Sequence, residues 1–104
     1  MYENIDEIEF AEKFAADDKA VLLDVRTQEE YDGGFIAGCE LMDIFQPDFK
    51  NKLEGLDKSK NYYVYCRSGN RSGQACGLMA QMGFTGELYN LDGGIMGWTQ
   101  NLEY

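Results

Sequence analysis

An α/β fold with a parallel sheet between helices is the architecture that this sequence predicts. Two observations indicate it. Short runs rich in aromatic and β-branched residues alternate with segments of helical periodicity, and these runs are apolar throughout, as in strands that are buried on both faces. The length of 104 residues and a hydrophobic fraction of 44% fit one globular domain with one core, which we expect to span residues 1–104.

The first predicted helix covers residues 5–15. Asp6 is a favourable N-cap residue and Glu9 follows three positions later, which is the pattern of a capping box. Because apolar residues recur at helical spacing, one face of this helix should pack on the sheet. The residues expected on that face are Ile8, Ala11, Phe14 and Ala15.

The second predicted helix is short and follows an apolar strand at residues 20–25. Thr27 and Glu30 repeat the capping-box pattern, and Gly33-Gly34 ends the helix. The other expected elements are a strand at 39–42, a helix at 47–53 that begins with Pro47, a strand at 62–65, a helix at 72–82 despite its two glycines, a strand at 86–91 and a short last helix at 95–98. Strands and helices therefore alternate along the chain.

The most informative stretch begins with the strand at 62–65. It runs directly into Cys66 and then into a short loop that contains Arg67 and Arg71, before the helix predicted from Ser72. The first N–H groups of a helix lack intrahelical partners, and the helix dipole adds partial positive charge there. Both effects favour a thiolate, so the pattern predicts a reactive cysteine in an anion-binding loop. An isolated cysteine would more often be a small buried hydrophobic residue, but the loop that follows reverses that preference.

Polar or glycine-rich segments follow three of the predicted strands. They are Asp24-Val25-Arg26, the loop from Cys66 to Arg71, and Asp92-Gly93-Gly94. Binding sites of parallel sheets lie at the carboxyl ends of the strands, so we expect these segments to share one rim. Asp24 and Arg26 could pair there and brace the loop, whereas a solvated or structural pair is the better interpretation of an Asp–x–Arg triplet taken alone. Gly93-Gly94 is expected to make a tight turn near the loop.

Composition excludes several classes of function. The formal net charge of −10 argues against nucleic acid and anionic membranes as partners. The absence of histidine excludes Cys–His and Ser–His–Asp catalysis, and three cysteines without a CxxC pattern argue against a disulfide framework or a zinc site. No apolar run is long enough to span a bilayer and no secretory signal is encoded, so a cytoplasmic protein with reduced thiols is expected.

Three motifs resemble the signatures of the rhodanese (sulfurtransferase) family. The segment Cys66 to Ser72 resembles the active-site loop of that family. The first signature is matched by Asp24-Val25-Arg26-Thr27 with Glu30-Tyr31, Gly34, Ile36 and Gly38, and the closing one by Asn90 to Trp98. The motifs occur in the family's order and at its usual spacing, and together they cover nearly the whole chain. The resemblance implies a three-layer α/β/α fold around a central, mostly parallel five-stranded sheet.

The resemblance also implies a function. The protein would move sulfane sulfur from thiosulfate, or another persulfide donor, to a thiophilic acceptor such as cyanide, a thiol or a protein. Cys66 would be the nucleophile and carry the sulfur as a persulfide in a two-step covalent scheme. The implied substrate-binding residues are Arg67, Ser68, Gly69, Asn70, Arg71 and Ser72, with Asp24 and Arg26 in support. Arg67 would orient the anionic donor and Arg71 would order the loop. No metal and no organic cofactor is implied.

Two alternative functions stay open. A rhodanese-like module could bind or carry persulfide without turning over thiosulfate, with the same residues. A phosphatase or arsenate reductase of related fold has five residues between its cysteine and its arginine, whereas only four separate Cys66 from Arg71. The shorter loop favours sulfur over a phosphoryl group, which carries three equatorial oxygens.

The remaining notable side chains receive mostly structural interpretations. Cys39 is expected in the core, and Cys76 is expected to pack toward the sheet, with a role as a resolving thiol as the alternative. Phe35, Phe45 and Trp98 are candidates for the mouth of the loop, although packing is the favoured role of Trp98. The sequence departs from the family pattern at Phe35, where histidine is common, and near Met42-Asp43, where a proline is usual.

Overall fold

The computed structural model describes residues 1–104 and has a five-stranded sheet flanked by helices. The elements in chain order are β1 (Glu3–Ile5), α1 (Glu7–Ala16), β2 (Ala20–Asp24), α2 (Gln28–Asp32), β3 (Cys39–Leu41), α3 (Phe49–Glu54), β4 (Asn61–Tyr65), α4 (Asn70–Gln81), β5 (Leu88–Leu91) and the 3-10 turn η1 (Ile95–Gly97). The predicted alternation of strands and helices is confirmed. The strand β1 was not predicted, because only three residues form it and only Ile5 among them is buried.

The strand order is β1-β5-β4-β2-β3, and every neighbouring pair is parallel. The strand β4 therefore lies in the middle of the sheet, and the cysteine that follows it lies at the centre of the carboxyl rim. Asp24 at the end of β2 is in register with Tyr65 at the end of β4. The segments that follow these two strands leave the sheet at the same level, as predicted.

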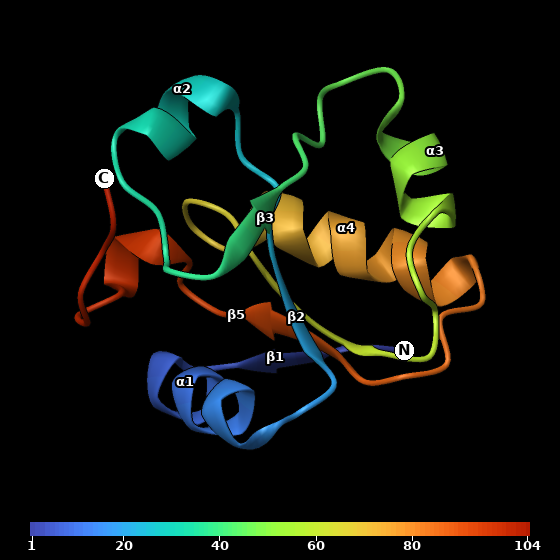
Figure 1. Ribbon diagram of the computed structural model, residues 1–104, viewed down its shortest axis with the longest axis horizontal. Coiled ribbons are helices and arrows are strands. Elements are labelled where there is room, and N and C mark those ends of the chain that lie inside the picture. The colour runs from blue at the N-terminus through green and yellow to red at the C-terminus, as the bar shows by residue number, and fades with distance from the viewer.

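The sheet is the middle of three layers (Figure 1). Successive side chains of a strand point to opposite faces, and β4 shows this clearly. Val64 and Cys66 pack with residues of α3 and α4, whereas Tyr63 and Tyr65 pack with Phe10 of α1. The central strand is buried on both sides, which explains why its sequence is apolar without alternation.

Several predicted boundaries and one predicted helix face are wrong. The first helix begins at Glu7 rather than at residue 5, because Ile5 belongs to the strand β1, and β5 begins at Leu88 rather than at residue 86. The buried residue of α1 is Phe10, which is 1% exposed, whereas Ile8 is 59% exposed. The larger aromatic rings of Phe10 and Phe14, which are four positions apart, pack edge-on against Tyr63 and set the orientation of the helix. The helix α3 begins at Phe49 rather than at Pro47, and α4 begins at Asn70 rather than at Ser72.

Both predicted capping boxes place a side chain on the first turn of a helix. The Oδ1 of Asp6 accepts a hydrogen bond from the N–H of Glu9 at 2.9 Å. At α2 the box is complete: Thr27 Oγ1 accepts from the N–H of Glu30, and the Glu30 carboxylate accepts from the N–H of Thr27. The second box fixes Glu30 beside the carboxyl rim.

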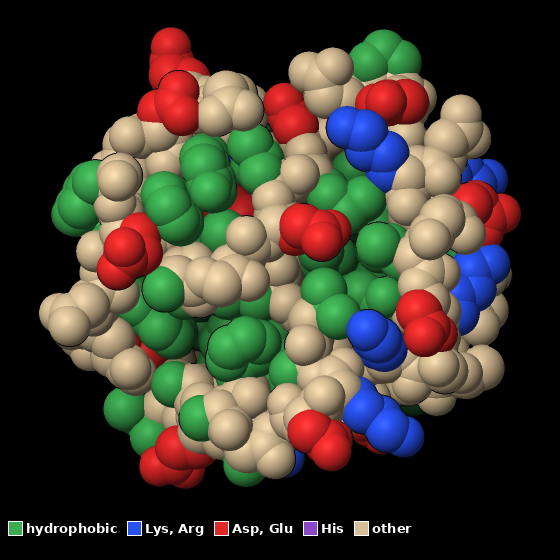
Figure 2. Space-filling view, in the orientation of Figure 1, with side chains coloured by type: hydrophobic (Ala, Val, Ile, Leu, Met, Phe, Trp, Pro, Cys, Tyr) green, Lys and Arg blue, Asp and Glu red, His purple; other side chains and the backbone are tan.

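Charged groups are distributed unevenly on the face seen in Figure 2. The Lys and Arg side chains visible in this view lie mainly toward the side of α3, and acidic side chains occur all round the outline. Hydrophobic side chains are visible between α1 and the carboxyl-terminal segment. None of the helices is both long and apolar enough to cross a membrane.

Candidate functional site

Cys66 lies directly after β4 and beneath the loop that leads to α4. The residue is 1% exposed, and its Sγ accepts hydrogen bonds from the N–H of Gly69 at 3.1 Å and from the hydroxyl of Ser72 at 3.3 Å. Burial alone would raise the pKa of the thiol. The Ser72 hydroxyl and the backbone N–H groups of Ser72, Ser68 and Gly69 outweigh burial and lower the pKa of Cys66 below its ordinary value. The loop therefore stabilises a thiolate.

The predicted anion-binding loop owes its shape to a glycine. Gly69 is the N-cap residue of α4 and has a φ angle of +101°, which residues with a Cβ rarely adopt. This conformation turns the N–H of Gly69 toward Cys66 Sγ. Arg67, Ser68 and Asn70 are exposed on the outer side of the loop, and Ser72 is fully buried beside the sulfur.

The turn after β5 is hydrogen-bonded to the backbone of the same loop. The N–H of Ile95 donates to the carbonyl of Cys66 at 2.9 Å, and the N–H of Met96 donates to the carbonyl of Arg67 at 3.0 Å. A side chain at Gly94 would overlap the backbone of Arg67, so glycine is required for this approach. The prediction that Gly93-Gly94 makes a tight turn near the loop is confirmed.

Arg71 makes an ion pair with Glu30 of α2. Its Nη1 lies 2.7 Å from Glu30 Oε1 and its Nη2 lies 2.8 Å from Oε2. Side-chain exposure is 20% for Arg71 and 27% for Glu30. The Arg71 guanidinium, together with hydrogen bonds from Thr27, lowers the pKa of Glu30 to about 2 against the opposing effect of burial. This bidentate pair ties the first turn of α4 to α2.

The variant Glu30→Gln is expected to show how much this pair stabilises the fold. Because the folded-state pKa of Glu30 lies below its usual 4.5, its contribution is complete above pH 4.5 and is lost as the pH falls toward 2. Urea unfolding should therefore show the variant about 1–3 kcal/mol less stable at pH 7, with no difference near pH 2. Glu29→Gln, at an exposed position, is the matched control. A difference that does not change with pH would contradict the assignment.

Asp24 and Arg26 form a buried brace under the rim. The Arg26 guanidinium donates from Nη2 to Asp24 Oδ2 at 2.7 Å and from Nε to Oδ1 at 3.0 Å. It also donates to the backbone carbonyls of Glu30 and Gly34. The hydroxyl of Tyr65 donates to Asp24 Oδ2 and accepts from the N–H of Ile36. The predicted pairing is therefore present, and it is connected to the loop after Cys66 through α2 and the Glu30–Arg71 ion pair.

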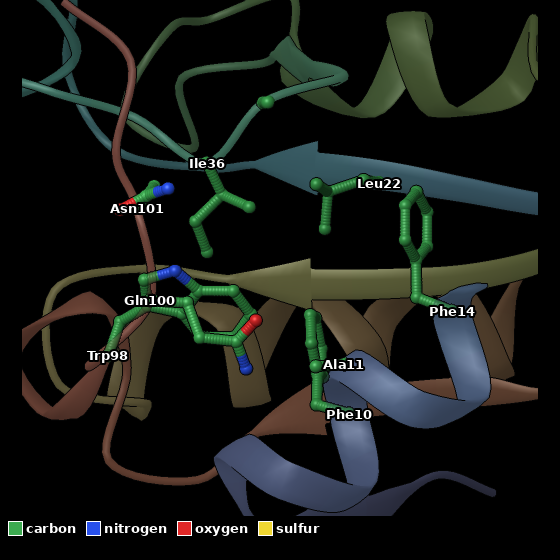
Figure 3. A pocket seen from close by; sticks show the side chains of 9 residues that line it. Phe10, Ala11, Phe14, Leu22, Ile36, Trp98, Gln100 and Asn101 are labelled. Carbon is green, nitrogen blue, oxygen red and sulfur yellow. The ribbon is translucent and has the colours of Figure 1, made fainter.

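The three aromatic candidates for the mouth of the loop lie in different places. Phe45 is 67% exposed, and its ring centroid lies 5.7 Å from the Arg71 guanidinium carbon, so it flanks the loop. Phe35 stacks on Tyr31 at 4.2 Å between ring centroids. Trp98 packs edge-on against Phe10 and lines an apolar cavity of about 530 Å³ on the α1 side, with Ile36 opposite (Figure 3). Packing is thus its role, as favoured from the sequence.

The other two cysteines lie apart from the loop donors. Cys76 of α4 is fully buried in the same apolar cluster as Cys66, and burial raises the pKa of its thiol to about 12. Such a thiol is a poor nucleophile at neutral pH. Cys39 is half-buried, and its Sγ lies 3.5 Å from the hydroxyl of Tyr65. No group of three or more Cys, Asp or Glu side chains is arranged to hold a metal ion.

Comparison with known proteins agrees with this geometry. The family model of the rhodanese-like domain matches residues 7–101. The chain belongs to the rhodanese-like family. A protein described as a sulfurtransferase, from Allochromatium vinosum, is 31% identical over 101 residues, which is 97% of this chain and 92% of that one. YtwF of Bacillus subtilis is 40% identical over 87 residues, or 84% of this chain and 81% of the relative.

Solved structures show the same fold. A rhodanese-like domain protein from Staphylococcus aureus superposes on this chain with a TM-score of 0.83 at 26% sequence identity. The match covers 97% of this chain and 96% of that structure. The predicted family and the predicted three-layer fold with a parallel five-stranded sheet are therefore confirmed.

Sequence reasoning did not identify two residues that shape the rhodanese-like loop. Glu30 was recognised as a capping residue, but its pairing with Arg71 joins positions 41 residues apart. Asn90 donates from Nδ2 to the carbonyl of Gly69 at 3.0 Å and was noted only as part of the closing motif. An asparagine within the buried strand Leu88–Leu91 is the signal that could have singled out Asn90.

Proposed function

We propose that the protein is a single-domain sulfurtransferase in which Cys66 carries sulfane sulfur as a persulfide. The observation that carries this proposal is the environment of Cys66 Sγ, which accepts hydrogen bonds from Gly69 and Ser72 at the amino end of α4. These donors lower the pKa of the thiol without any general base. The name of the Allochromatium relative supports sulfur transfer as the activity.

The proposed first step is attack of the Cys66 thiolate on the outer sulfur of thiosulfate or of another persulfide donor. A new S–S bond forms at Cys66 while the S–S bond of the donor breaks. The electron pair of the broken bond leaves with sulfite when thiosulfate is the donor, and with a thiolate when the donor is a persulfide. Sulfite is a stable anion, so the step requires no proton donor. In the second step an acceptor such as cyanide or a thiolate attacks the outer sulfur, and the Cys66 thiolate is released.

The loop donors suit both states of the sulfur. The N–H of Gly69 and the hydroxyl of Ser72 that stabilise the thiolate are also able to stabilise the negative outer sulfur of a persulfide. Because Cys66 is 1% exposed, a single sulfur atom reaches it more easily than a phosphoryl group with three equatorial oxygens. This supports sulfur chemistry over the phosphatase alternative.

A persulfide carrier is the second candidate, and one observation favours it. Glu30 neutralises Arg71, which leaves Arg67 as the arginine of the loop without an ion pair. One free guanidinium in a chain of net charge −10 is a weak attraction for the thiosulfate dianion. A monoanionic persulfide, delivered by a small molecule or a partner protein, would then be the better donor. Three free cysteines fit a reducing compartment, and we propose the cytoplasm.

Steady-state kinetics separate these candidates. Sulfite release and thiocyanate formation are measured while thiosulfate and cyanide are varied, and the transferase should give the parallel double-reciprocal lines of a two-step covalent scheme. A carrier should take sulfur from a persulfide donor such as cysteine persulfide and transfer it to dithiothreitol, with negligible turnover of thiosulfate. Failure of both donors with folded protein would contradict sulfur transfer altogether.

A further inference from the structure

We propose that Asn90 of β5 is a positioning residue that holds Gly69 so that its N–H points at Cys66 Sγ. The inference deepens the proposed function, because it explains how the reactivity of that same cysteine is set. The amide of Asn90 makes its hydrogen bonds to Asn4 and to the carbonyl of Gly69, not to the sulfur of Cys66. It acts through the backbone of Gly69 alone.

The chain of contacts is short and direct. Asn90 is 3% exposed, and its Nδ2 donates to the carbonyl oxygen of Gly69 at 3.0 Å and to Asn4 Oδ1 at 2.8 Å. The N–H of Gly69 in turn donates to Cys66 Sγ at 3.1 Å. Asn90 is in register with Val64, which lies two residues before Cys66. The amide of Asn90 therefore approaches the loop from the neighbouring strand of the sheet.

The backbone conformation of Gly69 has to be fixed by its neighbours. With a φ angle of +101° and no side chain, it sits in a conformation that its neighbours must select from the many open to glycine. As the N-cap residue of α4 it has no side-chain cap of its own. Its carbonyl oxygen also accepts from the N–H of Gly73 at 3.1 Å, so helix and amide together fix the peptide that follows Gly69.

The glycine at position 73 shows that the helix leaves room for this amide. A Cβ placed on Gly73 would lie 3.3 Å from Asn90 Nδ2, which is too close without displacement of the amide. Glycine disfavours a helix interior, so its presence in the first turns of α4 is explained by the approach of Asn90. A Cβ on Gly77, by contrast, would meet only a ring carbon of Tyr2 at 3.8 Å.

The fold itself does not need an amide at position 90. Leu88 precedes it on the face of β5 that packs toward α4, and all four residues of the strand are buried. The Oδ1 of Asn90 is buried with no hydrogen-bond partner, which disfavours the folded state. A leucine there would fill a similar volume without this penalty. The hydrogen bond from Asn90 Nδ2 to Gly69, rather than a gain in folding stability, explains why asparagine occupies this position.

The test replaces the donor and follows the cysteine directly. Asn90→Leu is alkylated with iodoacetamide from pH 5 to 10, and modification is followed on the peptide that contains Cys66. We expect the thiol pKa to rise and alkylation at pH 7 to slow about 3- to 10-fold, because a hydrogen bond to a charged group is weakened while intrinsic nucleophilicity partly compensates. The urea midpoint should be unchanged or higher. Asn4→Ala, which removes the other partner of the amide, should leave both quantities unchanged.

A second pair of variants keeps the inference falsifiable if Asn90→Leu does not fold. In Gly73→Ala the new Cβ should displace the side-chain amide of Asn90 and thereby raise the pKa of Cys66. Gly77→Ala should leave that pKa unchanged. An unshifted pH profile in folded Asn90→Leu or in Gly73→Ala, or an equal shift in either control variant, would overturn the inference. Alkylation does not require sulfur transfer. A wild-type protein that forms no persulfide would therefore contradict the proposed function, whereas the alkylation rates would still show whether Asn90 sets the pKa of Cys66.

Discussion

Replacing Asp24 by alanine is expected to lower the free energy of unfolding by about 3–5 kcal/mol, the largest effect on stability of any single change at the site. The side chain of Asp24 is fully buried and that of Arg26 is 6% exposed. Removal of the carboxylate leaves the Arg26 guanidinium without its counter-charge in the interior, and it also removes the acceptor of the Tyr65 hydroxyl. Since small domains are stable by about 5–15 kcal/mol, much of the stability should be lost.

Urea unfolding at pH 7 measures this loss. Asp48→Ala is the matched control, because Asp48 pairs with Lys52 at 3.9 Å on the surface, where the pair should contribute less than about 1 kcal/mol. If the free energy of unfolding of Asp24→Ala lies within about 1 kcal/mol of the wild-type value, the Asp24–Arg26 pair does not stabilise the rim.

Replacing Cys66 by serine is expected to reduce sulfur transfer by at least about 10³-fold while the protein stays folded. Serine is close to cysteine in size, and its hydroxyl can keep the contacts with Gly69 and Ser72. A hydroxyl is not ionised at neutral pH and forms no persulfide. The rate of thiocyanate or sulfide release from the loaded protein measures the effect, with circular dichroism as the check on folding.

The other cysteines provide the controls for that variant. Cys39→Ser should keep nearly full activity, because Cys39 contacts Tyr65 rather than the loop. Cys76→Ala should also keep it, since burial holds the Cys76 thiol protonated with a pKa of about 12. Residual activity of Cys66→Ser that disappears only when Cys76 is also replaced would contradict this account, and it would assign the sulfur to Cys76.

Features that depend on neighbours in the sequence could be predicted well. The capping boxes at Asp6 and Thr27 involve residues three positions apart, and the strand–cysteine–loop–helix order around Cys66 follows from continuous apolar and helical patterns. The placement of Cys66 at the carboxyl rim required only the rule for parallel sheets. The family resemblance added the number of strands.

Features that depend on packing between distant residues could not be predicted. The buried face of α1 was predicted around Ile8, because helical spacing alone does not show that Phe10 packs against the ring of Tyr63 on the central strand. The partner of Arg71 was not foreseen for the same reason, since an arginine in an anion-binding loop can pair with a substrate or with a carboxylate such as Glu30. The sequence indicated which side chains carry the chemistry, but the residues that these side chains contact depend on how the chain folds.

The central claim is that Cys66 accepts sulfane sulfur, and mass spectrometry of the protein after incubation with donor tests it most directly. The wild type is treated separately with thiosulfate and with cysteine persulfide, digested, and examined for the peptide that contains Cys66. We expect that peptide to gain about 32 Da, one sulfur atom, and to lose it on addition of cyanide. A folded wild-type protein that gains no sulfur on Cys66 from either donor would contradict the account.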